Sequence, residues 1–239
     1  MVRAILFLTL GQLATGILLF IALIPPSKIG KGFGRFHTAL ALALWILAMW
    51  GNFTLPFWIL FGSLILAAAF SGSNAGYYPF LFLSIGISFY LLVNGNASAT
   101  GEPFLSNIPS VLVLGASSVA MLLGHWYLVT PKLSIVYLKV LTIGLLISII
   151  IKSGVLITAL LQNTSSLSTH HFYEMYGIFF WQRVVLGLVL TFVLTIMTYL
   201  CVRIRSTQSA TGILYVVVVF CLVGELIGSY LFMKTGILF

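Results

Sequence analysis

Aspartate is absent from this 239-residue chain, and acidic residues as a whole are nearly absent. The three that occur are Glu102, Glu174 and Glu225, and charged residues make up only 6% of the sequence. A soluble domain carries roughly 25% charged residues, because its surface faces water. So little charge excludes a soluble globular protein and leaves no stretch for a separate soluble domain.

Cysteine is scarce as well, and the basic residues are confined to particular places. Cys201 and Cys221 both fall inside apolar runs, so they indicate neither a disulfide framework nor a metal motif. The formal net charge is +8, but most basic residues lie in short loops between apolar runs. That placement is typical of membrane topology signals, and we therefore do not expect nucleic acid as a partner.

What the chain has instead is hydrophobic residues, which make up 61% of it, arranged in long runs. Because about 20 apolar residues cross a bilayer as a helix, the runs predict about eight transmembrane helices. They cover residues 4–24, 34–50, 56–71, 78–94, 109–129, 135–162, 176–202 and 210–232. The second and third are short, so a hairpin that does not fully cross is an alternative there. We expect one domain, 1–239: an all-α integral membrane protein in contact with lipid.

The loops between the runs predict how the bundle is oriented. Loops after the first, third, fifth and seventh runs hold most of the basic loop residues: Lys28, Lys31, Arg35, Lys132, Arg203 and Arg205. The opposite loops and the termini hold only Arg3 and Lys234. Because cytoplasmic loops are enriched in Lys and Arg, both termini are expected outside.

Three charged residues lie well inside apolar runs: Lys152, Arg183 and Glu225. Each costs roughly 2.5–3.5 kcal/mol to insert at a helix centre, so each calls for a partner. At a rise of 1.5 Å per residue, all three are expected about 10–15 Å below the outer surface. Gln12 in the first run is expected at the same depth. The spacing therefore predicts one polar cluster that several helices share.

Further polar residues are expected at the outer mouth of the seventh run: His170, His171 and Glu174. One interpretation of the whole arrangement is a structural ion pair between Arg183 and Glu225 that orients two helices. The other is a polar pocket open to the outer side, which is the default hypothesis for intramembrane ionisable residues. A flat, amphipathic ligand with carbonyl groups, such as a quinone, would suit that pocket.

Two more histidines, His37 and His125, are expected near the inner ends of their runs and at one depth. Histidines on two helices at the same level can ligate a b-type haem from opposite faces. The alternative is that each caps its helix, hydrogen-bonds a carbonyl group or lies in the headgroup region. The chain has no C-x-x-C-H attachment motif that would support a covalently held haem.

Three segments resemble the membrane-anchor subunit of DMSO-reductase-type molybdoenzymes, a relative of the polysulfide reductase anchor. They are Gly11-Gln12 with Gly16, Phe180-Trp181-Gln182-Arg183-Val184-Val185-Leu186, and Leu222-Val223-Gly224-Glu225-Leu226-Ile227-Gly228. The resemblance implies a subunit of a respiratory complex in a bacterial or archaeal plasma membrane. It also implies an iron–sulfur partner subunit, a molybdopterin subunit, and oxidation of a quinol such as menaquinol near the outer face.

The resemblance carries Gln12, Arg183 and Glu225 over as quinone-binding positions, while Lys152 comes from the depth argument alone. On this hypothesis Glu225 also acts in the reaction, and Glu174 or His171 relays protons outward. The sequence departs from the family at residues 48–53, where a quinol-binding histidine is missing, and the third run lacks the family's acidic residue. The rival functions are a structural scaffold without quinone turnover, a b-type cytochrome subunit and, least favoured, a small transporter.

Overall fold

The computed structural model describes the chain except for residues 52, 100–103, 131–132 and 164–169, and it does not describe the side chains of 27, 96–99, 104–106 and 170–174. Its elements are α1 (Val2–Ile21), α2 (Pro26–Ile29), α3 (Lys31–Ala48), α4 (Leu55–Ala69), α5 (Asn74–Ala99), α6 (Phe104–Val129), α7 (Val136–Gln162), α9 (His170–Val184), the π-helical turn η1 (Val185–Leu190), α10 (Thr191–Arg203) and α11 (Thr207–Thr235). All regular structure in the described part is helical, as predicted.

Every predicted run coincides with a helix or, for the seventh run, with the continuous stack α9, η1 and α10. Within the described residues, six helices are long and apolar enough to cross a membrane: α1, α5, α6, α7, the α9–α10 stack and α11. The two remaining predicted spans are α3, with 18 residues, and the apolar α4, with 15. At 1.5 Å per residue α4 is about 22 Å long, so its full crossing stays a prediction.

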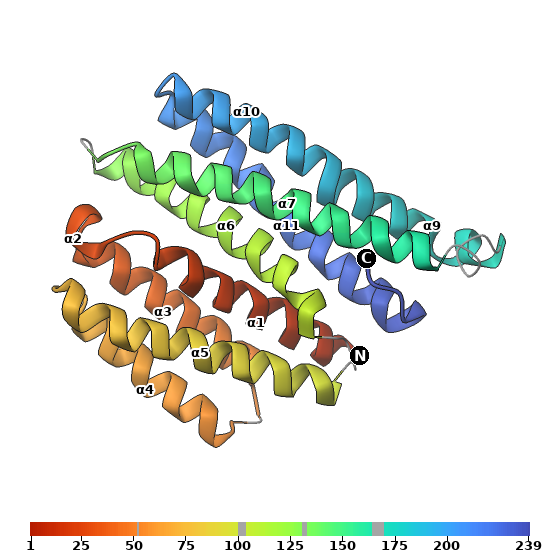
Figure 1. The fold of residues 1–239 in the computed structure, drawn as a ribbon, viewed down its shortest axis with the longest axis horizontal. Coiled ribbons are helices and arrows are strands. Elements are labelled where there is room, and N and C mark those ends of the chain that lie inside the picture. The colour runs from red at the N-terminus through yellow and green to blue at the C-terminus, as the bar shows by residue number, and fades with distance from the viewer. Residues whose placement is uncertain (52, 100–103, 131–132, 164–169) are drawn as a thin grey trace.

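The helices run side by side along one direction, as expected of a multi-pass membrane protein (Figure 1). Helices α1, α3, α4 and α5 form one half of the molecule, and α6, α7, the α9–α10 stack and α11 form the other. The two halves meet mainly where α1 packs on α6. These two helices are also the most enclosed: 72% of the α6 span and 61% of α1 are buried, against 28% of the α9–α10 stack.

Two glycines allow α1 and α6 to pack so closely. A Cβ atom added to Gly16 would lie 2.7 Å from Cα of Gly115, which real side chains do not do. Small residues at such a contact let two backbones approach and gain dispersion energy where no water is available to drive association. The close contact between the two halves therefore depends on glycine, which has no side chain, at both Gly16 and Gly115.

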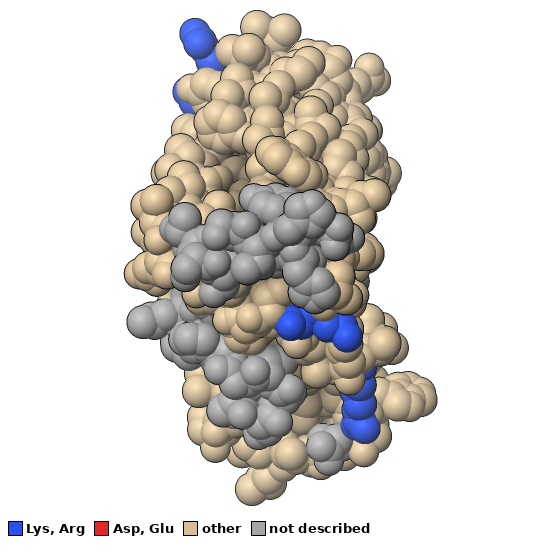
Figure 2. Space-filling model, turned by 90° about the vertical axis from the view of Figure 1, so that its right-hand side faces the viewer, with Lys and Arg blue, Asp and Glu red and all other residues tan. Residues whose placement is uncertain are grey.

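Both termini lie at the same end of the bundle (Figure 1). Viewed from that end, Lys and Arg are sparse on the surface (Figure 2). The basic residues Lys28, Lys31 and Arg35 belong to α2 and the start of α3. These segments follow the end of α1 and lie at the end of the bundle opposite the termini (Figure 1). This charge asymmetry is the one from which outside termini were predicted, and the orientation itself stays a prediction.

Candidate functional site

The three charges inside the apolar helices contact one another. Glu225 on α11 accepts from Arg183 on α9, with 2.9 Å between Nη2 and Oε1, and lies 3.3 Å from Nζ of Lys152 on α7, measured to Oε2. Their side chains are at most 8% exposed. The three residues that were predicted at one depth therefore form one buried ion-pair cluster. We define the cluster as Lys152, Arg183 and Glu225.

Glycines provide the room for the Arg183 guanidinium. A Cβ atom on Gly224 would lie 2.9 Å from Nη1 of Arg183, one on Gly187 would lie 3.1 Å from that nitrogen, and one on Gly228 would lie 3.2 Å from Nε. The spacing of Gly224 and Gly228 on α11 therefore serves a buried cation as well as close helix packing. The guanidinium also donates to the backbone oxygen of Phe239 at 3.3 Å.

The π-helical turn η1 follows Arg183 directly. Within it Gly187 faces Gly224 so closely that a Cβ atom would lie 3.0 Å from Cα of Gly224. Thr191 donates to the carbonyl oxygen of Leu186, five residues earlier, at 2.8 Å. Such π turns change the angular offset of side chains along a helix and are frequent near functional positions. Here the turn accommodates the crossing of α11 next to the cluster.

Hydrogen bonds extend the cluster towards α6 and α1. Lys152 donates to Oγ of Ser110 at 2.8 Å, and Gln12 donates to Oδ1 of Asn107 at 2.7 Å. Gln12 and Asn107 are each only 2% exposed. Gln12, Ser110, Lys152 and Glu225 line a common cavity of about 20 Å³. Three of the four residues that the sequence predicted to bind a quinone, Gln12, Lys152 and Glu225, therefore line this small space, and the fourth, Arg183, is paired with Glu225 beside it.

The residues predicted at the outer mouth belong to the start of α9. The side chains of His170, His171 and Glu174 lie outside the described residues, although their backbone belongs to the first turns of α9. Their proposed proton-relay role stays a prediction.

The two inner histidines lie in different surroundings. His37 on α3 is fully buried, its Nδ1 is 2.8 Å from the carbonyl oxygen of Phe33, and its Nε2 has no hydrogen-bond partner among the described residues. His125 on α6 is exposed, and its Nδ1 lies 3.1 Å from the hydroxyl of Tyr215 on α11. A ligating histidine does commonly anchor its other nitrogen on a carbonyl, as His37 does. Haem ligation by this pair stays a prediction.

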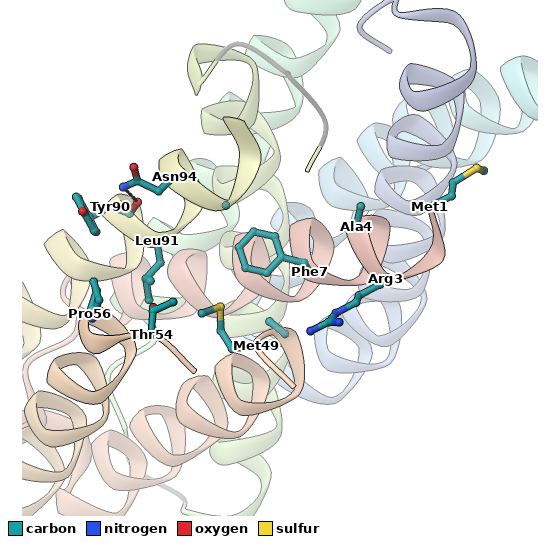
Figure 3. A pocket seen from close by; sticks show the side chains of 12 residues that line it. Met1, Arg3, Ala4, Phe7, Met49, Thr54, Pro56, Tyr90, Leu91 and Asn94 are labelled. Atoms are coloured by element: carbon teal, nitrogen blue, oxygen red, sulfur yellow. Dashed lines mark hydrogen bonds between the residues drawn. The ribbon is translucent and has the colours of Figure 1, made fainter. Parts of the chain in front are cut away.

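A larger cavity, of about 640 Å³, lies in the other half of the bundle, at the end that holds the N-terminus (Figure 3). We call it the chamber. It is an open space bordered by α1, α3, α5 and the start of α4, and its lining residues are Met1, Arg3, Ala4, Phe7, Ala48, Met49, Thr54, Pro56, Tyr90, Leu91, Asn94 and Gly95. Most of these are apolar, and Arg3, Thr54, Tyr90 and Asn94 supply the polar groups.

Two contacts shape the chamber. Arg3 at the start of α1 donates to the carbonyl oxygen of Trp50 after α3 at 2.8 Å, which ties these helix ends together. Gly95 on α5 lies against the ring of Phe7, and a Cβ atom there would overlap that ring. Sequence reasoning missed the chamber, because it counted Arg3 as a topology signal and had no reason to single out Gly95.

Comparison with known proteins returned no match: no family model, no curated protein and no solved structure is similar to this chain. The resemblance to the molybdoenzyme anchor subunits therefore stays a prediction from three short motifs. The interpretation of the site depends on its geometry.

Proposed function

We propose that this protein is a quinone-binding membrane subunit of an electron-transfer complex, and that the quinone ring enters the chamber. The single observation that carries the proposal is the chamber itself. Ligand sites are typically concave, mostly apolar spaces of about 300–1,000 Å³ with a few placed polar groups. A cavity of about 640 Å³ with four polar residues in an apolar lining fits that description.

The chemistry of the lining suits a quinone in particular. A quinone presents a flat apolar ring and two carbonyl oxygens that accept hydrogen bonds. The chamber offers the ring of Phe7 and the apolar side chains of Met49 and Leu91, and its candidate donors are the guanidinium of Arg3 and the hydroxyl group of Thr54 (Figure 3). Among the described residues that line the chamber, none is acidic.

The sequence predicted one polar site that both binds a quinone and pairs the buried charges, whereas we assign these two roles to two separate sites. The chamber receives the ring, whereas the cluster of Lys152, Arg183 and Glu225 borders only about 20 Å³ and holds helices α7, α9 and α11 in register. For comparison, a cavity that binds benzene measures roughly 150 Å³. Oxidation of the corresponding quinol to the quinone releases two electrons and two protons, and an iron–sulfur subunit docked at the same end of the bundle would accept the electrons.

A ligand titration tests the chamber. In lipid nanodiscs, a short-tailed naphthoquinone quenches the tryptophan fluorescence of a protein that binds it, and Trp45 lies 6.1 Å from the chamber's Phe7, centroid to centroid. In Gly95→Ala the added methyl group overlaps the Phe7 ring and displaces it towards the chamber. The displaced ring takes up space that the quinone would occupy, so we expect at least about tenfold weaker binding. Gly86→Ala on the same helix is the control, because no atom lies within 4 Å of the added methyl group.

Two results would contradict the proposal. One is quenching by the wild-type protein that does not saturate, and the other is an unchanged dissociation constant in Gly95→Ala. Purification from native membranes tests the remainder: the complex should contain iron and acid-labile sulfide in amounts that scale with this subunit.

The second candidate function is a structural scaffold that binds no quinone. One observation favours it: the charges of the cluster are directly paired and hydrogen-bonded, as a register-setting network requires. A scaffold predicts no saturable quinone binding, together with loss of assembly when Glu225 is replaced.

A further inference from the structure

A small cavity lies between α1, α6, α7 and α11, apart from the chamber. Its volume is about 20 Å³, and its polar lining comes from Gln12, Ser110, Lys152, Glu225 and Ser229. A cavity needs roughly 10–15 Å³ of such volume to hold one water molecule, and it needs two to four polar partners for that water. The space is therefore of the right size and polarity for one water molecule.

One buried group at this cavity lacks a hydrogen-bond partner. The amide nitrogen of Gln12 donates a hydrogen bond to Asn107. Its Oε1 accepts none from the described residues, although Gln12 is only 2% exposed. Exchanging oxygen and nitrogen in both amides leaves the same deficit, with donor and acceptor interchanged. Buried polar side-chain atoms are nearly always satisfied by protein or by ordered water. The unsatisfied atom thus points to a ligand that can hydrogen-bond to it.

We propose that this cavity is a binding site for a single ordered water molecule, which joins Gln12 to the cluster of Lys152, Arg183 and Glu225. The water donates one hydrogen to Oε1 of Gln12 and the other to the carboxylate of Glu225. It accepts from the hydroxyl group of Ser229, which lies one helical turn beyond Glu225 on α11. Three hydrogen bonds are the usual number for a buried water.

The site has a structural consequence. It completes a hydrogen-bonded chain from Asn107 on α6 through Gln12 on α1 and the water to Glu225 on α11. Direct packing between α1 and α11 is slight compared with that between α1 and α6. The water therefore supplies a polar link between the two halves of the bundle at the depth of the ion pairs. It does not depend on a quinone in the chamber.

A high-resolution electron cryo-microscopy map of the full chain in nanodiscs tests the site directly. We expect a density peak within hydrogen-bonding distance of both the Gln12 amide and the Glu225 carboxylate. A map that resolves ordered waters elsewhere in the bundle but has no peak there would overturn the proposal.

A cavity-filling variant tests the water site, because the direction of its effect on the apparent melting temperature depends on whether a water is bound. Val155→Ile adds one methylene group at a residue that lines the cavity. If a water is bound, the extra group displaces it, and the apparent melting temperature falls by at least about 2 °C. If the cavity is dry, the added contacts leave that temperature unchanged or raise it, which refutes the proposal. Val140→Ile, at a 46% exposed position of the same helix, is the matched control and should change nothing.

Discussion

Replacing Glu225 with glutamine should destabilise the protein far more than removing either of its cationic partners. In Glu225→Gln the shape is kept, but Lys152 and Arg183 lose the carboxylate that they share. Nζ of Lys152 lies 3.3 Å and Nη2 of Arg183 lies 2.9 Å from its oxygens, and the two side chains are 8% and 1% exposed. Breaking a buried pair by removing one partner costs roughly 3–5 kcal/mol, and here two cations are affected.

Lys152→Met should be the mildest of the three changes. It leaves the closer pair, Arg183 with Glu225, neutral as a unit and intact at 2.9 Å. The losses include the hydrogen bond to Ser110 and one ion-pair contact, so we expect about 1–2 kcal/mol. Arg183→Met should fall between the other two, because the remaining pair of Lys152 and Glu225 is separated by 3.3 Å.

Equilibrium unfolding with SDS in mixed micelles measures these free energies, and Lys234→Met, an exposed cation on the same helix as Glu225, is the control. The double variant Arg183→Met with Glu225→Gln should cost clearly less than the sum of the single variants, since residues in one network couple. Equal losses for Glu225→Gln and Lys152→Met, or additivity in the cycle, would refute the idea that Glu225 is the shared centre.

Two further predictions concern other parts of the bundle. Gly16→Ala should destabilise the protein by about 1–3 kcal/mol, because the methyl group meets the backbone of α6; in the same unfolding assay Gly154→Ala, with no atom within 4 Å, should be neutral or slightly stabilising, and equal effects would argue against the close contact. If His37 and His125 ligate a b-type haem, the dithionite-reduced minus oxidised absorption spectrum of the purified protein has an alpha band that His37→Ala removes, whereas a wild-type spectrum without that band excludes the haem.

The helices and the ion-pair cluster could be predicted from the sequence because both follow from fixed geometry. A rise of 1.5 Å per residue converts position in an apolar run into depth, so Lys152, Arg183 and Glu225 could be assigned to one level before any fold was known. The cost of an unpaired charge in an apolar helix then required a partner. The structure meets that requirement with two ion-pair contacts to Glu225.

Ser110 and Asn107 could not be singled out in the same way. Serine is frequent in the predicted runs, and Asn107 lies just before the run 109–129, so their partnership with Lys152 and Gln12 depends on which face of α6 is turned inward. The π-helical turn at 185–190 is also invisible in the composition, since its residues continue the apolar run without a break. Helix rotation and local pitch are tertiary outcomes, which hydrophobic periodicity does not determine in an all-apolar segment.

The chamber escaped prediction for a different reason: it is defined by small side chains. Ala4, Ala48 and Gly95 leave space where larger residues would fill it, and four separate chain segments must come together before that space is formed. The chamber and the water site are both reached by α1, through Phe7 and Gln12. These residues are five positions apart, about 7.5 Å along the axis and roughly 140° around it, so α1 turns different faces to the two sites. Because the two sites share no lining residue, Gly95→Ala and Val155→Ile act on separate contacts, and failure of either proposal leaves the other standing.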